Sequence, residues 1–188
     1  RNSSPELDAL GVQVQVGLDV ADADSIEGLL ESLNGVKLDW LLNNAGTMER
    51  TFLGNMNFES AMRQFTVNAL GPLRVTEAML PQLKAGSKVG IVTSRMGSIS
   101  DNTSGGQYGY RMSKAAVNAA GVSLARDLLP QKIAVALLHP GYVQTDMTDR
   151  RGNVSPAASA KGLIERMDAL TLEKSGSFWH ADGQELPW

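Results

Sequence analysis

A tyrosine and a lysine lie four residues apart in the stretch GQYGYRMSKAAVNAAG, at Tyr110 and Lys114. In a helix, residues four positions apart lie on the same face, so the phenol and the ammonium can face one cavity. A nearby cation favours the phenolate and lowers the pKa of a tyrosine from about 10, which suits acid–base work near neutral pH. This pair would serve proton exchange with an alcohol or a carbonyl, although the same spacing also occurs on ordinary solvated helix faces.

Several β-rich runs end in residues that could contact a ligand near this pair. The run SKVGIVTS ends at Ser94, whose hydroxyl could hold a substrate oxygen beside Tyr110. The run KIAVALLHPG ends in the sharp turn of Pro140 and Gly141. The run LLNNAG closes on small residues that let a ligand pack against main chain. Ligands of a parallel sheet lie beyond the carboxyl ends of its strands, so these ends point to one crevice.

The elements that would position these residues alternate along the chain. Five β-rich runs are found, at 12–20, 37–46, 87–94, 132–141 and 176–183. Three helical patterns lie between them, at 21–35, 57–83 and 109–130. The alternation predicts βαβ units and therefore an α/β fold with a doubly wound, Rossmann-like parallel sheet in three α/β/α layers.

The composition indicates a single domain. The 188 residues are 43% hydrophobic and show no repeat or linker. With 17 basic and 20 acidic residues and no long run of one sign, neither nucleic acid nor a membrane is expected as a partner.

Cysteine and histidine usage excludes further classes of site. There is no cysteine, and His139 and His180 stand far apart in sequence, so no metal site is expected. The apolar runs are too short to span a bilayer, and the first residues lack the apolar stretch of a signal peptide. We therefore expect a cytoplasmic protein.

Taken in order, these residues resemble the short-chain dehydrogenase/reductase family, from about Val12 to the C-terminus. That family carries an Asn-Asn-Ala-Gly strand end, a catalytic Asn, a Ser, a Tyr-x-x-x-Lys pair and a Pro-Gly turn. The matching residues here are Asn43 to Gly46, Asn68, Ser94, Tyr110 with Lys114, and Pro140 with Gly141. The stretch SRMGSISDNTSGGQYGYRMSKAA and the ending DGQELPW are similar to the C-factor and sniffer-like carbonyl reductase branch.

The resemblance implies an NAD(P)-dependent oxidoreductase that transfers hydride between a nicotinamide and a carbonyl or alcohol substrate. Tyr110 would be the general acid/base, and Lys114 would lower its pKa and bind the nicotinamide ribose. Ser94 would orient the substrate oxygen, and Asn68 would hold a water that continues a proton relay from Lys114. Residues 145–159 resemble the lid that closes over cofactor and substrate in this family.

The resemblance also implies a set of cofactor contacts. Asp19, with its neighbour Val20, would meet the adenine. The adenosine half would be lined by Asn43, Asn44, Ala45 and Gly46, and the nicotinamide by Pro140, Gly141, Val143 and Thr145. Purely structural interpretations remain open, in which Asp19 is a helix-side cap, Asn68 a satisfied helix-kink residue and Thr145 the N-cap of a short turn.

The sequence departs from the family at its start, because the glycine-rich turn Thr-Gly-x-x-x-Gly-x-Gly is not found. We therefore expect residues 1–188 to be one domain that lacks the first strand, its helix and the second strand. The runs 12–20 and 37–46 would then each lack a neighbouring strand. Arg1 would follow the missing second strand, where a guanidinium suits the 2′-phosphate of NADP, which favours NADP over NAD.

Two further expectations concern partners. An alternative to the enzyme is a non-catalytic, C-factor-like cell–cell signalling or partner-binding protein on the same scaffold, which the missing phosphate turn allows. A homo-oligomer, either a dimer or a tetramer, is also expected. In many relatives, the helices corresponding to 58–83 and 108–129 pair across a two-fold axis.

Overall fold

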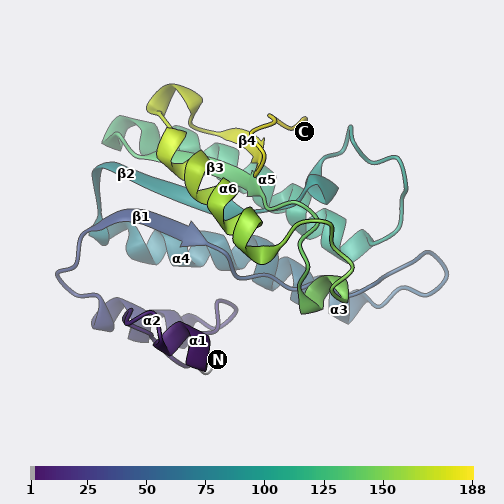
Figure 1. The fold of residues 1–188 in the computed structure, drawn as a ribbon, viewed down its shortest axis with the longest axis horizontal. Coiled ribbons are helices and arrows are strands. Elements are labelled where there is room, and N and C mark those ends of the chain that lie inside the picture. Colours follow the sequence, from purple (N-terminus) through teal and green to yellow (C-terminus); the bar gives the residue numbers. More distant parts are fainter. Residues whose placement is uncertain (1–2) are drawn as a thin grey trace.

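A four-stranded parallel sheet lies at the centre of the protein (Figure 1). The structure is a computed structural model and describes residues 3–188, so the predicted contact at Arg1 lies outside the described residues. The strands are adjacent in chain order, and each pairs in parallel with the next. They are β1 (Leu38–Asn43), β2 (Leu83–Val92), β3 (Ala134–His139) and β4 (Ser177–His180). Four of the five predicted β-rich runs are confirmed as strands.

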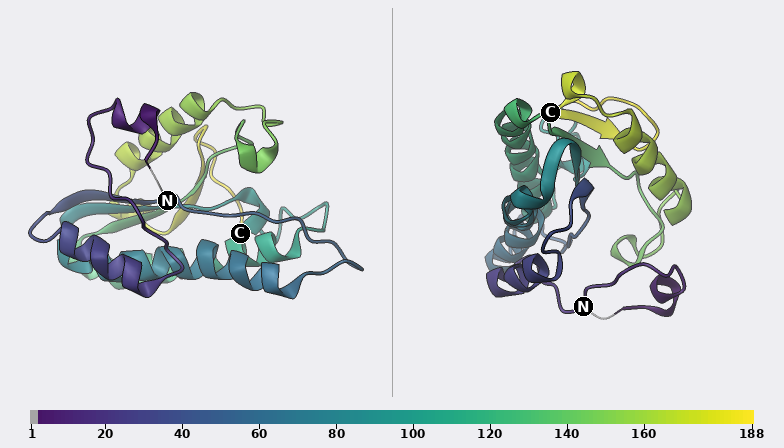
Figure 2. Two further views of the ribbon diagram at one scale, coloured as in Figure 1. Left: turned by 90° about the horizontal axis from the view of Figure 1, so that it is seen from below. Right: turned by 90° about the vertical axis from the view of Figure 1, so that its left-hand side faces the viewer.

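Helices cover both faces of this sheet, which confirms the three-layer α/β/α arrangement (Figure 2). One face is covered by α2 (Ala23–Ser32), α3 (Phe58–Phe65), α4 (Gly71–Met79) and α5 (Tyr108–Leu128), and a π-helical turn, η1 (Thr66–Leu70), joins α3 to α4. The other face carries α6 (Pro156–Ala169), and the short α1 (Pro5–Asp8) lies near the N-terminus. No helix in residues 3–188 combines the length and apolar character needed to cross a bilayer.

The strand β3 shows why the sheet needs a helix layer on each side. Val135 packs with Val117 of α5 in one apolar cluster. Leu138 packs with Met167 of α6 in another. Neighbouring side chains of a strand point to opposite faces, so a strand buried on both sides is apolar along its buried length, as expected for a parallel sheet.

The prediction of a strand over 12–20 was wrong. The segment begins with alternating apolar and polar residues but forms no strand, and Val12 and Val16 are exposed. A strand needs a partner for its backbone N–H and C=O groups, and in the described part of the chain β1 pairs only with β2. Leu18 and Val20 instead pack beside α2 and α4.

The helix α6 is not among the predicted helices, and its first turn overlaps the end of the predicted lid over 145–159. Residues from Pro156 onward form the first turn of α6. The helix begins as expected from capping chemistry, since Ser155 accepts a hydrogen bond from the Ala158 N–H and proline occupies the first helical position. Only the part of the predicted lid up to Ser155 lies outside this helix.

Met167 provides a test of the α6 layer, because its side chain is buried at 1% exposure against β3. Met167→Ala leaves a cavity that the sheet cannot close, so we expect the free energy of unfolding to fall by about 2–5 kcal/mol in urea titrations. Ile164→Ala, on the same helix but 52% exposed, should change it by no more than about 0.5 kcal/mol. Equal effects of the two substitutions would contradict the assigned packing.

Candidate active site

Three strand ends and one helix start meet at one edge of the sheet. The carboxyl ends of β1, β2 and β3 lie side by side because their strands pair in parallel register. The helix α5 begins at this edge and carries Tyr110 and Lys114 in its first two turns. This is the edge at which α/β sheets bind their ligands.

Lys114 is buried where β1 and β2 end. Its Nζ donates a hydrogen bond to the Val92 carbonyl oxygen, at 3.0 Å, and lies 5.7 Å from the centroid of the Tyr110 ring. A methyl group added at Gly46, beyond the end of β1, would lie 3.7 Å from the same nitrogen. The tyrosine is 8% and the lysine 4% exposed, so both side chains are buried and do not form a solvated helix face.

Burial controls the protonation of both groups. It raises the pKa of Tyr110 above its ordinary value, and the neighbouring Ser94 hydroxyl acts in the opposite direction. Burial also lowers the pKa of Lys114 to about 8. The prediction that the pKa of Tyr110 is brought down was therefore wrong in direction, because desolvation outweighs the hydrogen bond with Ser94, while the Lys114 ammonium is bonded to the Val92 carbonyl oxygen.

Ser94 is held against the tyrosine helix by a short turn, η3 (Arg95–Gly97). The Ser94 hydroxyl accepts a hydrogen bond from the Met96 N–H at 3.1 Å and caps this turn. Gly97 allows the close approach, since a methyl group there would lie only 2.7–2.9 Å from atoms of Lys114. The chain after β2 and the helix α5 are thus fixed to each other at the site.

Asn68 lies in the π-helical turn and is fully engaged with protein groups. Its side-chain amide bonds both the N–H and the carbonyl oxygen of Thr47, each at 2.8 Å, and donates to the Ser113 hydroxyl at 2.9 Å. The structural interpretation of Asn68, as a helix-kink residue whose side-chain hydrogen bonds are made within the protein, therefore fits its side chain. Sequence reasoning did not identify Thr47 and Ser113 as hydrogen-bond partners of Asn68, because they lie 21 and 45 positions away from it.

A hollow of about 280 Å³ lies beside the end of β1. It brings Val20 together with Asn43, Asn44 and Ala45, all of them predicted cofactor contacts. The remaining lining is apolar and comes from Leu18, Leu29, Leu41, Leu42, Pro72 and Val75. Asp19 is exposed, and its carboxylate accepts a hydrogen bond from the Ala21 N–H at 2.9 Å, whereas the N-cap residue of α2 is Asp22.

The end of β3 forms the predicted turn. Gly141 has a left-handed φ of +87°, which a residue with a side chain adopts only with strain. The Ser159 hydroxyl of α6 donates to the Pro140 carbonyl oxygen at 2.7 Å. The turn is therefore fixed to the helix layer on the opposite face of the sheet from α5.

The loop after this turn closes on itself. Val143 forms an isolated parallel bridge with Val154. Thr145 is the N-cap residue of a short turn, η5 (Asp146–Thr148), in agreement with its structural interpretation. Two of the four predicted nicotinamide contacts, Val143 and Thr145, therefore belong to one loop that borders the strand end.

His139 and His180 are far apart in sequence, yet the register of β3 and β4 places their ring centroids 4.8 Å apart. Burial, together with the nearby His180 and Arg95, lowers the pKa of His139 to about 3. A histidine that is neutral at pH 7 and so weakly basic is a poor proton acceptor. His139 is therefore a packed residue at the end of β3 rather than a candidate general base.

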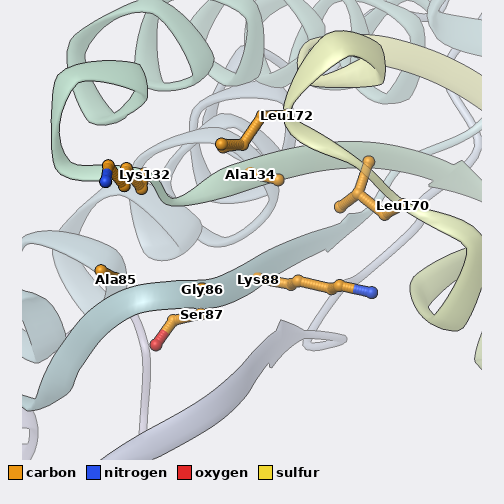
Figure 3. A pocket seen from close by; sticks show the side chains of 8 residues that line it. All are labelled: Ala85, Gly86, Ser87, Lys88, Lys132, Ala134, Leu170 and Leu172. Carbon is orange, nitrogen blue, oxygen red and sulfur yellow. The ribbon is translucent and has the colours of Figure 1, made fainter.

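A second hollow, of about 430 Å³, lies at the opposite edge of the sheet, near the amino end of β3 (Figure 3). Its lining contains none of the predicted site residues. Lys88, one of its two cations, already donates to the carbonyl oxygens of Met167 and Asp168 at the end of α6. This hollow is larger than the one at β1 but carries no chemistry of the kind found around Tyr110.

Similarity to known proteins covers nearly the whole chain. Residues 5–154 match the family model described as short chain dehydrogenase. A 1-hydroxy-2-glutathionyl-2-methyl-3-butene dehydrogenase from Rhodococcus sp. is 46% identical over 189 residues, covering 97% of this chain and 84% of the relative. The C-signal protein of Myxococcus xanthus is 48% identical over 154 residues, covering 80% of this chain and 93% of the relative.

Solved structures agree with this assignment. An NADPH-bound carbonyl reductase from chicken fatty liver superposes with a TM-score of 0.89 at 29% identity, covering 97% of this chain and 82% of that one. The carbonyl reductase Sniffer of D. melanogaster superposes with a TM-score of 0.86 at 29% identity, covering 92% and 77%. The resemblance to the C-factor and sniffer-like branch is confirmed.

The buried ammonium predicts a pH dependence of stability. Lys114 releases its proton near pH 8 in the folded state and near pH ~10.4 when unfolded, so between these values the unfolded chain holds more protons and stability rises with pH. The free energy of unfolding, measured in urea, should rise by up to about 3 kcal/mol over this range.

Lys114→Met should lack this rise, whereas Lys161→Met, at an exposed position of α6, should keep it. Parallel pH profiles for the wild type and Lys114→Met would contradict a lowered pKa at this site.

Proposed function

Because the chain belongs to the short-chain dehydrogenase family, we propose that it is an NAD(P)-dependent reductase in which Tyr110 exchanges a proton with a carbonyl or alcohol substrate. The observation that carries this proposal is the buried grouping of Tyr110, Ser94 and Lys114 at the carboxyl edge of the sheet. Two hydroxyls and an ammonium converge there, while His139, at the end of β3, is too weak a base to compete.

The residues at this edge fit a nicotinamide dinucleotide. The hollow beside β1 has largely apolar walls and one buried amide, Asn43, which suits a flat base. Gly46 leaves open the space next to the Lys114 ammonium, where a ribose hydroxyl would find a donor. The nicotinamide half would be lined by Pro140, Gly141, Val143 and Thr145. The cofactor, when bound, supplies the hydride.

The protein side chains then manage the proton and the substrate oxygen. Ser94 and Tyr110 present two hydroxyls to the same space, so a carbonyl oxygen can accept a hydrogen bond from each. Burial keeps the Tyr110 phenol protonated at neutral pH, which makes it a proton donor to the oxygen that becomes an alcohol. In the reverse direction, the phenolate would accept the proton.

Lys114 and Asn68 support this proton transfer. The Lys114 ammonium lies near the tyrosine ring and would hold the cofactor ribose. The Asn68 side chain is occupied by Thr47 and Ser113. A water that continues a relay from Lys114 would therefore be bound by the main chain of the π-helical turn rather than by this amide.

Several finer assignments belong to the same proposal. The cofactor is NADP rather than NAD, which the NADPH-bound carbonyl reductase from chicken supports. The substrate is a small carbonyl or alcohol compound, and the relative from Rhodococcus, whose name contains a glutathionyl group, makes glutathione conjugates worth including among the substrates tested. We further propose a cytoplasmic homo-oligomer, a dimer or a tetramer.

The similarity to the C-signal of Myxococcus xanthus favours a second candidate function. In this alternative, the chain is a signalling or partner-binding protein that retains the reductase scaffold without its chemistry. The two candidates differ in their need for Tyr110. Absence of turnover by the wild-type protein with either nucleotide, together with partner binding that survives Tyr110→Phe, would favour the second function.

Tyr110→Phe tests the acid/base role. We expect kcat for carbonyl reduction to fall by at least about 100-fold, because the phenylalanine ring keeps the packing but cannot donate a proton. Binding of NADPH, monitored by the fluorescence of the nucleotide, should persist. Tyr108→Phe removes a more exposed phenol from the same helix and should retain wild-type turnover. Full activity of Tyr110→Phe would exclude the assignment.

The raised pKa of Tyr110 also predicts how the two reaction directions depend on pH. Reduction needs the protonated phenol, so its kcat/KM should stay level from about pH 6 to 8 and decline only in more alkaline solution. Alcohol oxidation needs the phenolate and should rise about tenfold per pH unit below the pKa. Initial rates in both directions measure this, and an oxidation rate that saturates below neutral pH would show the opposite shift.

A further inference from the structure

Thr51 lies in the loop between β1 and α3, yet it is buried at 1% exposure against the start of α5. Its carbonyl oxygen accepts a hydrogen bond from the Gln107 N–H at 2.7 Å, and its own N–H donates to Gln107 Oε1 at 3.3 Å. Its hydroxyl accepts a third hydrogen bond, from the Gly109 N–H at 3.2 Å. Gly109 is the residue immediately before Tyr110.

The helix α5 lacks a cap from its own sequence. Gln107 occupies the N-cap position with a left-handed φ of +51°, and its side chain makes no capping hydrogen bond. The first N–H groups of a helix have no partner within the helix and need an acceptor from elsewhere. Thr51 provides that acceptor for Gly109 across 58 positions of sequence.

The loop that carries Thr51 is itself held in place by side-chain amides. The Thr47 N–H donates to Asn68 Oδ1 at 2.8 Å, and the Glu49 N–H donates to Gln64 Oε1 at 3.1 Å. The Thr51 N–H donates to the Gln107 side chain in the same way. Every second residue of the loop, at 47, 49 and 51, therefore donates its N–H to a side-chain amide oxygen. Gln64 and Asn68 are buried and lie one turn apart, so this loop is fixed to the helices that also form the site.

We infer that Thr51 is a positioning residue for Tyr110. By capping α5 from the loop after β1, it holds the first turn of the helix closed and keeps the phenol buried beside Ser94. Without the hydroxyl, the Gly109 N–H loses its acceptor and the first turn can open toward solvent. The kinetic part of this inference rests on the proposed function, whereas the burial of the phenol does not.

The test uses the full chain and a matched set of variants. Thr51→Val keeps the shape of the side chain but removes the hydroxyl, and Thr51→Ser keeps the hydroxyl. Thr51→Ala also removes the hydroxyl but places no methyl group against the Gly109 N–H, so it serves if Thr51→Val does not fold. Ser123→Ala is the control, since it removes an exposed hydroxyl that bonds the Ala119 carbonyl oxygen elsewhere on α5.

The first readout is the titration of Tyr110 by NMR of protein labelled with ¹³C at the tyrosine ring. The chain has three tyrosines, and Tyr110→Phe assigns the signal. In the wild type, the midpoint should lie above about 10. It should move down toward that value in Thr51→Val and Thr51→Ala, because the phenol becomes exposed to water, and stay at the wild-type value in Thr51→Ser and Ser123→Ala.

The second readout is the kinetics of carbonyl reduction. For Thr51→Val, kcat should fall on the order of tenfold while KM for the carbonyl changes less than about twofold, because the phenol is displaced but the binding surfaces remain. Thr51→Ser should restore wild-type kcat.

The two readouts separate the possible failures. A wild-type midpoint for Tyr110 in a folded Thr51→Val or Thr51→Ala protein would overturn the inference, as would a lowered midpoint in Thr51→Ser. An inactive wild type with the expected NMR shifts would overturn the proposed function but leave the positioning of Tyr110 by Thr51 intact.

Discussion

A buried ammonium must find a hydrogen-bond acceptor, and the burial of Lys114 is the constraint on which the site depends. The acceptor is the Val92 carbonyl oxygen, which is available because β2 ends there. Gly97 then allows the chain after β2 to pass against the lysine itself. Tyr110, one turn earlier on α5, is brought over the same strand ends as a consequence. The position of the proposed proton donor thus follows from how one charge is accommodated.

This placement of the Lys114 ammonium requires strand ends that are held firmly within the parallel sheet. The strand β3 is buried on both faces, with Val135 packed toward α5 and Leu138 toward α6, so the strand ends cannot move independently of the helix layers. The β1 side is different, because in the described residues β1 has no strand beyond it and Trp40 and Leu42 remain partly exposed. The predicted adenosine contacts lie along this less enclosed side, whereas the tyrosine lies on the better packed one.

The loop after β1 connects these two sides. Its residues 47, 49 and 51 are bonded in turn to Asn68, Gln64 and Gln107, two of which lie on the α3–η1 segment and one at the start of α5. The Asn68 side chain therefore contributes to the site by holding the loop after β1 in place through Thr47. The same loop supplies the missing cap of the tyrosine helix. Structural and chemical roles coincide here because the helix that bears the proposed acid/base begins at the site.

The sequence alone determined the α/β class, four of the strands and the pairing of Tyr110 with Lys114, because alternation, helical spacing and strand-end residues are local properties. Tertiary structure decided what depends on distant partners. The run 12–20 has the pattern of a strand, but in the described residues it has no neighbour to pair with. Asn68 and Gly109 find their partners in a loop that no spacing rule connects to them. The pKa of Tyr110 moves upward rather than downward because desolvation, which no local pattern reports, exceeds the effect of the hydrogen bond with Ser94.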